Sequence, residues 1–86
     1  MSWLEEFLAQ LLKEIKLKWG SVELKLVKIR KNKVEIRMIV RDEKVKLLIY
    51  GNGRIWVASR LTGLNIALKR ISQRILEKVR GSESEG

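Results

Sequence analysis

The hydrophobic positions follow helical spacing at both ends of the chain. Over residues 2–19 they recur every three or four residues, and Gly20 follows as a residue suited to end a helix. This first stripe consists of Leu4, Leu8, Leu11, Ile15 and Trp19, widened by Phe7 and Leu12. The pattern returns over residues 61–80, and Gly81 is expected to end it. This second stripe consists of Leu64, Leu68, Ile71, Ile75 and Val79. Two amphipathic helices are therefore predicted.

Between the helices, the spacing changes to the alternation typical of β-strands. Four strands are expected over residues 22–30, 34–41, 44–50 and 54–58. In the first strand the apolar positions slip out of phase, which predicts a β-bulge near Leu26–Val27. Short polar segments separate the strands, the clearest being Gly51-Asn52-Gly53. Tight turns between consecutive strands predict an antiparallel meander.

The order of elements is therefore α-β-β-β-β-α. Two amphipathic helices each need an apolar surface, and the simplest arrangement packs both on one face of the sheet. This predicts a two-layer α+β domain whose other sheet face is open. The chain of 86 residues suits one domain, expected over residues 1–81. Residues 82–86 are small, polar and acidic, and we expect them to form a disordered tail.

The α-β-β-β-α part of this order is similar to that of double-stranded-RNA-binding domains. Those domains have three strands, a first hairpin loop that contains Gly-Pro, and a Lys-rich start to the last helix. This chain has four predicted strands, no Pro, and residues 59–62 in place of the lysines. The resemblance is one of element order alone, and element order does not establish function.

The charge is strongly positive and unevenly distributed. The 19 Lys and Arg residues outnumber the 10 Asp and Glu residues, which gives a net charge of +9. Residues 1–20 hold equal numbers of both signs, so the excess belongs to the predicted sheet and the last helix. A segregated positive surface favours nucleic acid, because neutralising phosphates releases their counterions. A positive surface can also serve solubility alone, or attract an anionic membrane surface.

Strand alternation predicts where these cations lie. If Val34, Ile36, Met38 and Val40 face the helices, then Arg37 and Arg41 face outward. The same alternation turns four lysines outward from the first and third strands. The candidate phosphate contacts on this face are Lys25, Lys28, Arg37, Arg41, Lys44, Lys46 and Arg54.

The length of the last hairpin loop decides whether aromatic rings join these cations. A three-residue Gly51–Gly53 loop pairs Leu48 with Trp56 and puts Tyr50, Arg54 and Trp56 on the open face. A two-residue Asn52–Gly53 loop turns Trp56 into the core instead, because a shift of one residue reverses every side chain. In the first register, Tyr50 and Trp56 are candidates to stack on bases or wedge into a groove.

These features predict a non-enzymatic protein that binds nucleic acid, DNA in preference to RNA, without reading its sequence. The chain lacks His and Cys, which removes the commonest general base, the commonest metal ligands and any thiol nucleophile. No catalytic residue, metal site or cofactor is therefore expected. The many Lys, Glu and Ile residues and the few Asn and Gln residues are typical of hyperthermophilic proteins.

A different class of function is an accessory subunit that docks on a larger nucleic-acid-processing protein, such as a replication or ribosomal assembly. The wide apolar stripe of the first helix is its candidate docking face, with Trp3, Leu4, Phe7, Leu8, Leu11 and Leu12. The first strand is a candidate for pairing in a homodimer, because it lies at a sheet edge. No membrane partner is expected, since no apolar run of about 18 residues exists and the N-terminal stretch is acidic. A cytoplasmic location follows from these expectations.

Overall fold

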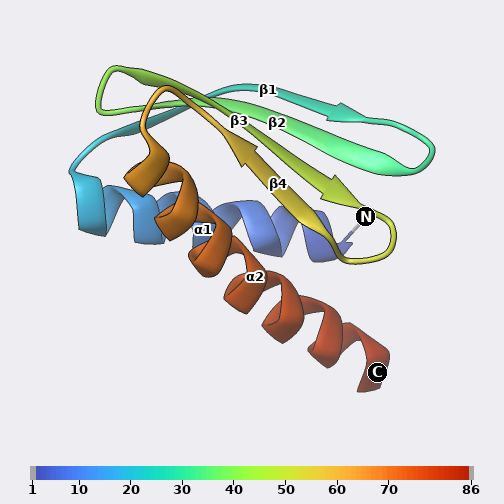
Figure 1. Cartoon of the computed structure of the whole chain (residues 1–86). Coiled ribbons are helices and arrows are strands. Elements are labelled where there is room, and N and C mark those ends of the chain that lie inside the picture. The colour runs from blue at the N-terminus through green and yellow to red at the C-terminus, as the bar shows by residue number, and fades with distance from the viewer. Residues whose placement is uncertain (1, 86) are drawn as a thin grey trace.

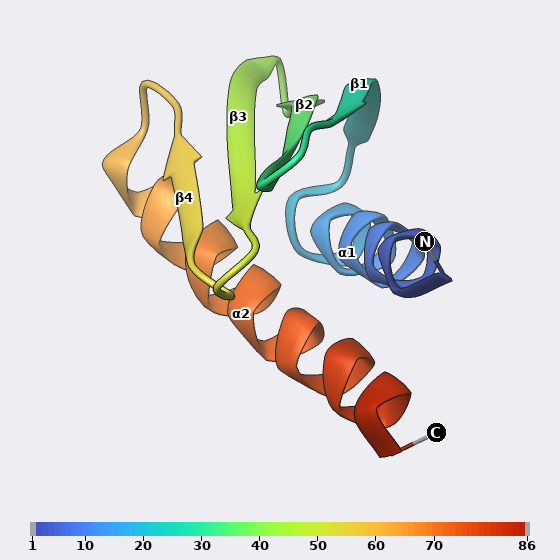
Figure 2. The same ribbon diagram turned by 90° about the vertical axis from the view of Figure 1, so that its right-hand side faces the viewer.

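The computed structural model describes residues 2–85 as two layers, with a sheet on one side and two helices on the other (Figure 1). The elements in chain order are α1 (Ser2–Trp19), β1 (Val22–Ile29), β2 (Lys33–Val40), β3 (Glu43–Tyr50), β4 (Ile55–Ala58) and α2 (Thr62–Glu85). The strands lie in the order β1-β2-β3-β4, and every neighbouring pair is antiparallel. Both helices cover the same face, α1 toward β1 and α2 toward β4 (Figure 2). The predicted α+β class and the antiparallel meander are confirmed.

Each helix buries the stripe that its spacing predicts. Leu4, Phe7, Leu11 and Ile15 of α1 are buried, and Trp3, Leu8 and Trp19 pack at the margin of the core. Gly20 ends α1 as expected, with a φ of 91° and an N–H that donates to the Lys16 carbonyl at 2.8 Å. The docking surface predicted on α1 is therefore mostly occupied, because its largest side chains already cover the sheet.

The end of α2 differs from the sequence prediction. The sequence predicts that Gly81 stops the helix, but α2 continues through it to Glu85. Among the described residues, the glycines with positive φ are Gly20 and Gly53, so Gly81 does not adopt the conformation that ends a helix. A helical glycine costs about 1 kcal/mol, which the packing of the preceding turns can offset. Residues 82–85, predicted to be a disordered tail, are thus part of α2, and Gly86 lies outside the described residues.

The register of the sheet settles which loop joins β3 and β4. Leu48 pairs with Trp56 and Ile49 with Ile55, as the three-residue loop predicts. The Tyr50 N–H donates to the Arg54 carbonyl at 2.8 Å, and the Gly53 N–H donates to the Tyr50 carbonyl at 2.9 Å. Gly53 has a φ of 90°, a conformation that glycine adopts without strain. The register that puts Trp56 on the open face is therefore confirmed.

The β-bulge in β1 is present but lies earlier than predicted. The register shifts between Leu24 and Leu26, so that Lys25 is the extra residue, rather than near Leu26–Val27. Leu26 consequently pairs with Arg37 on the open face, where the sequence pattern predicts an inward position. β1 is exposed along most of its length, so the positions of its apolar residues do not show which side chains face the helices.

A buried serine interrupts the apolar face of α2. The Ser72 side chain is 0% exposed, and its Oγ has no hydrogen-bond partner among the described residues. Burying a hydroxyl without a partner costs about 1–3 kcal/mol, and Ala is also a better helix former than Ser. We therefore expect Ser72 to lower the stability of the native state relative to alanine.

We expect Ser72→Ala to raise the free energy of unfolding by about 1–2 kcal/mol. Urea denaturation followed by circular dichroism measures this difference. Ser21→Ala, at an exposed position outside the helices, is the matched control and should change stability by less than about 0.5 kcal/mol. A loss of stability in Ser72→Ala would show that the hydroxyl has a partner such as a buried water molecule.

No helix among the described residues is long and apolar enough to cross a membrane. The apolar stripe of α2 faces the sheet instead, where Leu68, Ile75 and Val79 are buried.

Candidate nucleic-acid interface

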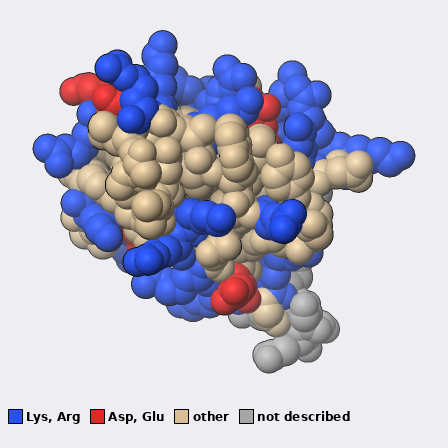
Figure 3. All heavy atoms as spheres, in the orientation of Figure 1, with Lys and Arg blue, Asp and Glu red and all other residues tan. Residues whose placement is uncertain are grey.

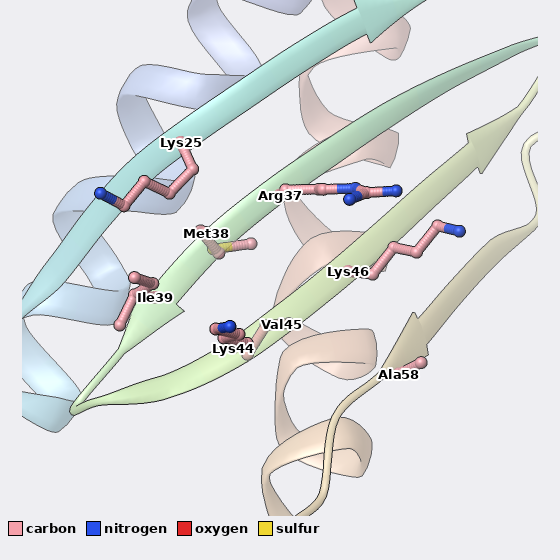
Figure 4. A pocket seen from close by; sticks show the side chains of 8 residues that line it. All are labelled: Lys25, Arg37, Met38, Ile39, Lys44, Val45, Lys46 and Ala58. Carbon is pink, nitrogen blue, oxygen red and sulfur yellow. The ribbon is translucent and has the colours of Figure 1, made fainter.

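The sheet face opposite the helices carries a cluster of cations around a shallow hollow of about 480 Å³. Lys25 comes from β1, Arg37 from β2, and Lys44 and Lys46 from β3, and Figure 4 shows these four side chains over the same stretch of sheet. Ile39 and Ala58 also line it. We call these four cations and the space between them the basic hollow. Three strands are needed to build it, so it exists only in the folded protein.

Cross-strand pairing explains why these cations come together. Arg37 lies directly opposite Lys46, and Ile39 lies directly opposite Lys44. Like charges directly opposite each other in an antiparallel pair are destabilising. Among the described residues, Lys44 and Lys46 form no ion pair. The basic hollow therefore has an unbalanced positive charge that an anionic ligand would neutralise.

Two acidic residues offset part of this charge. The Lys25 Nζ lies 3.1 Å from a carboxylate oxygen of Glu23, and both side chains are exposed. The Arg37 Nε donates to Glu35 at 2.7 Å, and the Glu35 side chain is only 8% exposed. Exposed ion pairs contribute little, so Glu35 is the more important of the two.

Glu35 sits in an unusual place for a carboxylate, on the open face but covered by its neighbours. Its partners across the sheet are Lys28 on β1 and Leu48 on β3. The hydrogen bond from Arg37 holds the pKa of Glu35 below its ordinary value of 4.5, against the effect of burial. The positive charges of Lys46, Arg37 and Arg30 lower this pKa further. The Glu35 carboxylate thus reduces the repulsion between the cations around it on the open face.

We expect Glu35→Gln to lower stability at neutral pH, by an amount that shrinks as the pH falls below about 4.5. The folded-state pKa is depressed, so the contribution of Glu35 is complete above the unfolded-state pKa and is lost as the pH falls through the folded-state pKa. Denaturation midpoints of the wild type and of Glu35→Gln, taken at several pH values between neutral and acid, measure the difference in stability. Glu77→Gln, on an exposed face of α2, is the control. A difference independent of pH would contradict the role of the charge.

A second hollow of about 510 Å³ lies beside the edge strand β4. Tyr50, Arg54 and Trp56 line it from the sheet. Lys69 and Gln73 line it from α2, and neither residue was among the predicted site residues. We call this space the aromatic groove. Trp56 is 50% exposed, which leaves its ring available for contact.

The remaining predicted site residues lie outside these two hollows. Arg41 occupies the β2–β3 turn with a φ of 48° and borders a separate hollow with Trp19 and Leu64, on the helix side of the sheet. The turn explains this position, because strand alternation no longer applies there. Lys28 is exposed on the open face, beside Glu35 rather than in the basic hollow. The sequence-predicted set is thus divided between the basic hollow, the aromatic groove and two flanking positions.

The positive surface extends beyond the basic hollow. In Figure 3, Lys and Arg side chains stand along the upper edge of the molecule, where β1, β2 and β3 lie, and acidic groups are few. Among the side chains that the structure describes, those of residues 3–81, no group of three or more acidic residues is arranged to hold a metal ion. The arrangement of the open face suits the binding of an extended anion with planar groups.

No protein-family model matches the chain, and no curated protein or solved structure matches it either.

Proposed function

We propose that the protein binds nucleic acid without base-sequence specificity through the open face of its sheet, with DNA as the favoured ligand. The phosphate backbone lies across the basic hollow, and bases stack on Trp56 and Tyr50 in the aromatic groove. The role of the protein is binding rather than catalysis.

The observation that carries this proposal is the convergence of four cations from three strands on one open surface. Arg37 and Lys46 face each other across the sheet, an arrangement that costs stability. A polyanion bound there would relieve this repulsion. Lysines act as point charges on phosphates rather than as readers of base edges, which favours binding independent of sequence.

The aromatic groove supports a ligand with accessible bases. Trp56 stands half-exposed next to Arg54 at the edge of the same face. Proteins that bind single strands combine a basic path for the backbone with exposed rings on which bases stack. We therefore propose that single-stranded DNA binds more tightly than the duplex.

Fluorescence anisotropy with labelled single-stranded DNA, duplex DNA and RNA tests the proposal. Each phosphate neutralised contributes about −0.7 to −0.9 to the slope of log affinity against log salt, so four contacts give a slope of about −2.8 to −3.6. Absence of binding to all three ligands at low salt would overturn the proposal. Binding whose affinity does not change with salt would overturn the role of the basic hollow.

We expect Glu35→Gln, although less stable, to bind single-stranded DNA about three- to tenfold more tightly. The substitution removes the negative charge that offsets Arg37, so the charge of Arg37 acts on the ligand without an opposing carboxylate. The same anisotropy titration measures the affinities of the wild type and of Glu35→Gln at a temperature where both are folded. A weaker affinity would mean that Glu35 positions Arg37 for binding, and that its charge is not an obstacle.

A further inference from the structure

β1 is an edge strand whose apolar side chains the fold leaves uncovered. Among the described residues it pairs only with β2, so its outer side presents backbone N–H and C=O groups to solvent. Leu24 is 39% exposed and Ile29 is 57% exposed, although both lie on the helix side of the sheet. In Figure 2, β1 stands at the end of the sheet farthest from α2. This edge is therefore available for contact with another strand.

Because of the bulge, the order in which the side chains of β1 point to the helix side or to the open face is the same from both ends of the strand. Four of its residues pair with helix-facing positions of β2, namely Val22, Leu24, Val27 and Ile29. Glu23 and Lys28 pair with open-face positions, and Lys25–Leu26 lies between the two halves. From either end, the order is helix side, open side, helix side. A strand with this symmetry can pair with a copy of itself without exchanging its two faces.

We infer that β1 pairs antiparallel with β1 of a second copy of the chain, about a two-fold axis between Lys25 and Leu26. Glu23 then lies opposite Lys28 of the second copy, and the symmetry repeats this pair of opposite charges. Leu24 lies opposite Val27 of the second copy, and Val22 lies opposite Ile29. The charged pairs lie on the open face, and the apolar pairs lie on the helix side.

In this register, every residue of β1 lies opposite a residue of the second copy that points to the same side of the sheet. A shift of one residue would set Leu24, on the helix side, opposite Lys28, on the open side. In the matched register, the outer residues that β1 exposes on each face meet a partner of suitable chemistry, and at the centre Lys25 lies opposite Leu26 of the second copy. The partner is therefore a second copy rather than an unrelated strand.

The dimer would form one continuous sheet with four strands from each copy. The two basic hollows would lie on the same side of this sheet, because the pairing keeps open faces together. The inference depends on the shape and chemistry of β1, not on nucleic-acid binding, so either proposal can fail without the other.

Sedimentation and disulfide cross-linking test this pairing. The chain has no Cys, so Glu23→Cys and Lys28→Cys each introduce a single thiol at an exposed position. A mixture of the two variants should form a disulfide between them under mild oxidation. Neither variant alone should do so, because equivalent thiols would lie about 16 Å apart along the paired strands, beyond the ~7 Å limit between Cα atoms.

The wild-type chain should sediment with the mass of two chains in the absence of nucleic acid. Glu77→Cys on α2, mixed with Lys28→Cys, is the control and should not cross-link. A wild-type monomer up to the highest soluble concentration would overturn the inference. A dimer in which each variant cross-links to itself as readily as in the mixture would also overturn it, since the register would then be wrong.

Discussion

Replacing Lys44 and Lys46 together with Ala is expected to weaken binding to single-stranded DNA by on the order of 10- to 100-fold at low salt. Both lysines line the basic hollow, and neither forms an ion pair among the described residues. No acidic group in the described part of the chain is therefore in direct contact with either ammonium group, although Lys46 also interacts electrostatically with Glu35. The loss of two phosphate contacts should also reduce the salt slope by about 1.4 to 1.8.

Lys13→Ala/Lys16→Ala is the matched control, because it removes the same charge from exposed positions on α1. The control should reduce affinity much less, since long-range attraction is screened beyond about 10 Å at moderate salt. Anisotropy titrations of both double variants at several salt concentrations separate these outcomes. Equal losses in the two variants would mean that net charge, and not the basic hollow, determines binding.

Trp56→Ala is expected to lower the affinity for single-stranded DNA by about 5- to 150-fold, which corresponds to about 1–3 kcal/mol for one stacked base. Its ring is 50% exposed in the aromatic groove, so its removal should leave the core intact. The salt slope should stay unchanged, because no phosphate contact is lost. This separates the effect of the ring from that of the lysines.

Trp56→Phe and Leu61→Ala are the controls for this substitution. The first keeps a stacking ring and should retain most of the affinity. The second removes an exposed apolar side chain from a different surface and should have no effect. An unchanged affinity in Trp56→Ala would rule out stacking on this residue and leave the phosphate contacts as the source of binding.

The sequence predicted most of the fold because its periodicities are clear where burial is one-sided. The α1 stripe and the alternation of β2 are examples, since their apolar positions became core. The loop at Gly51–Gly53 offered two registers, and only the fold decided between them. In β1 the pattern predicted the wrong position for the bulge. That strand is exposed on both faces, so its apolar residues are not those that face the core. The prediction that Gly81 ends the last helix was wrong for a different reason: glycine favours a helix end without requiring one, and α2 continues through it.

The candidate site was less predictable because it depends on contacts between elements. Alternation predicted that Arg37, Lys44 and Lys46 face outward, but not that they border one hollow. The contribution of α2 to the aromatic groove, through Lys69 and Gln73, required the packing of the helix beside β4. Glu35 is an exposed acid in the sequence pattern. Its burial arises from neighbours on two other strands and from Arg37.

Mapping of amide chemical shifts by NMR, during titration with a short single-stranded DNA at low salt, tests the central proposal most directly. We expect the largest changes to cluster on β2, β3 and β4, around Arg37, Lys46 and Trp56, and α1 to change little. Changes that are confined to the helices would overturn the proposed binding surface, and a spectrum unaffected by single-stranded DNA, duplex DNA and RNA alike would overturn nucleic-acid binding.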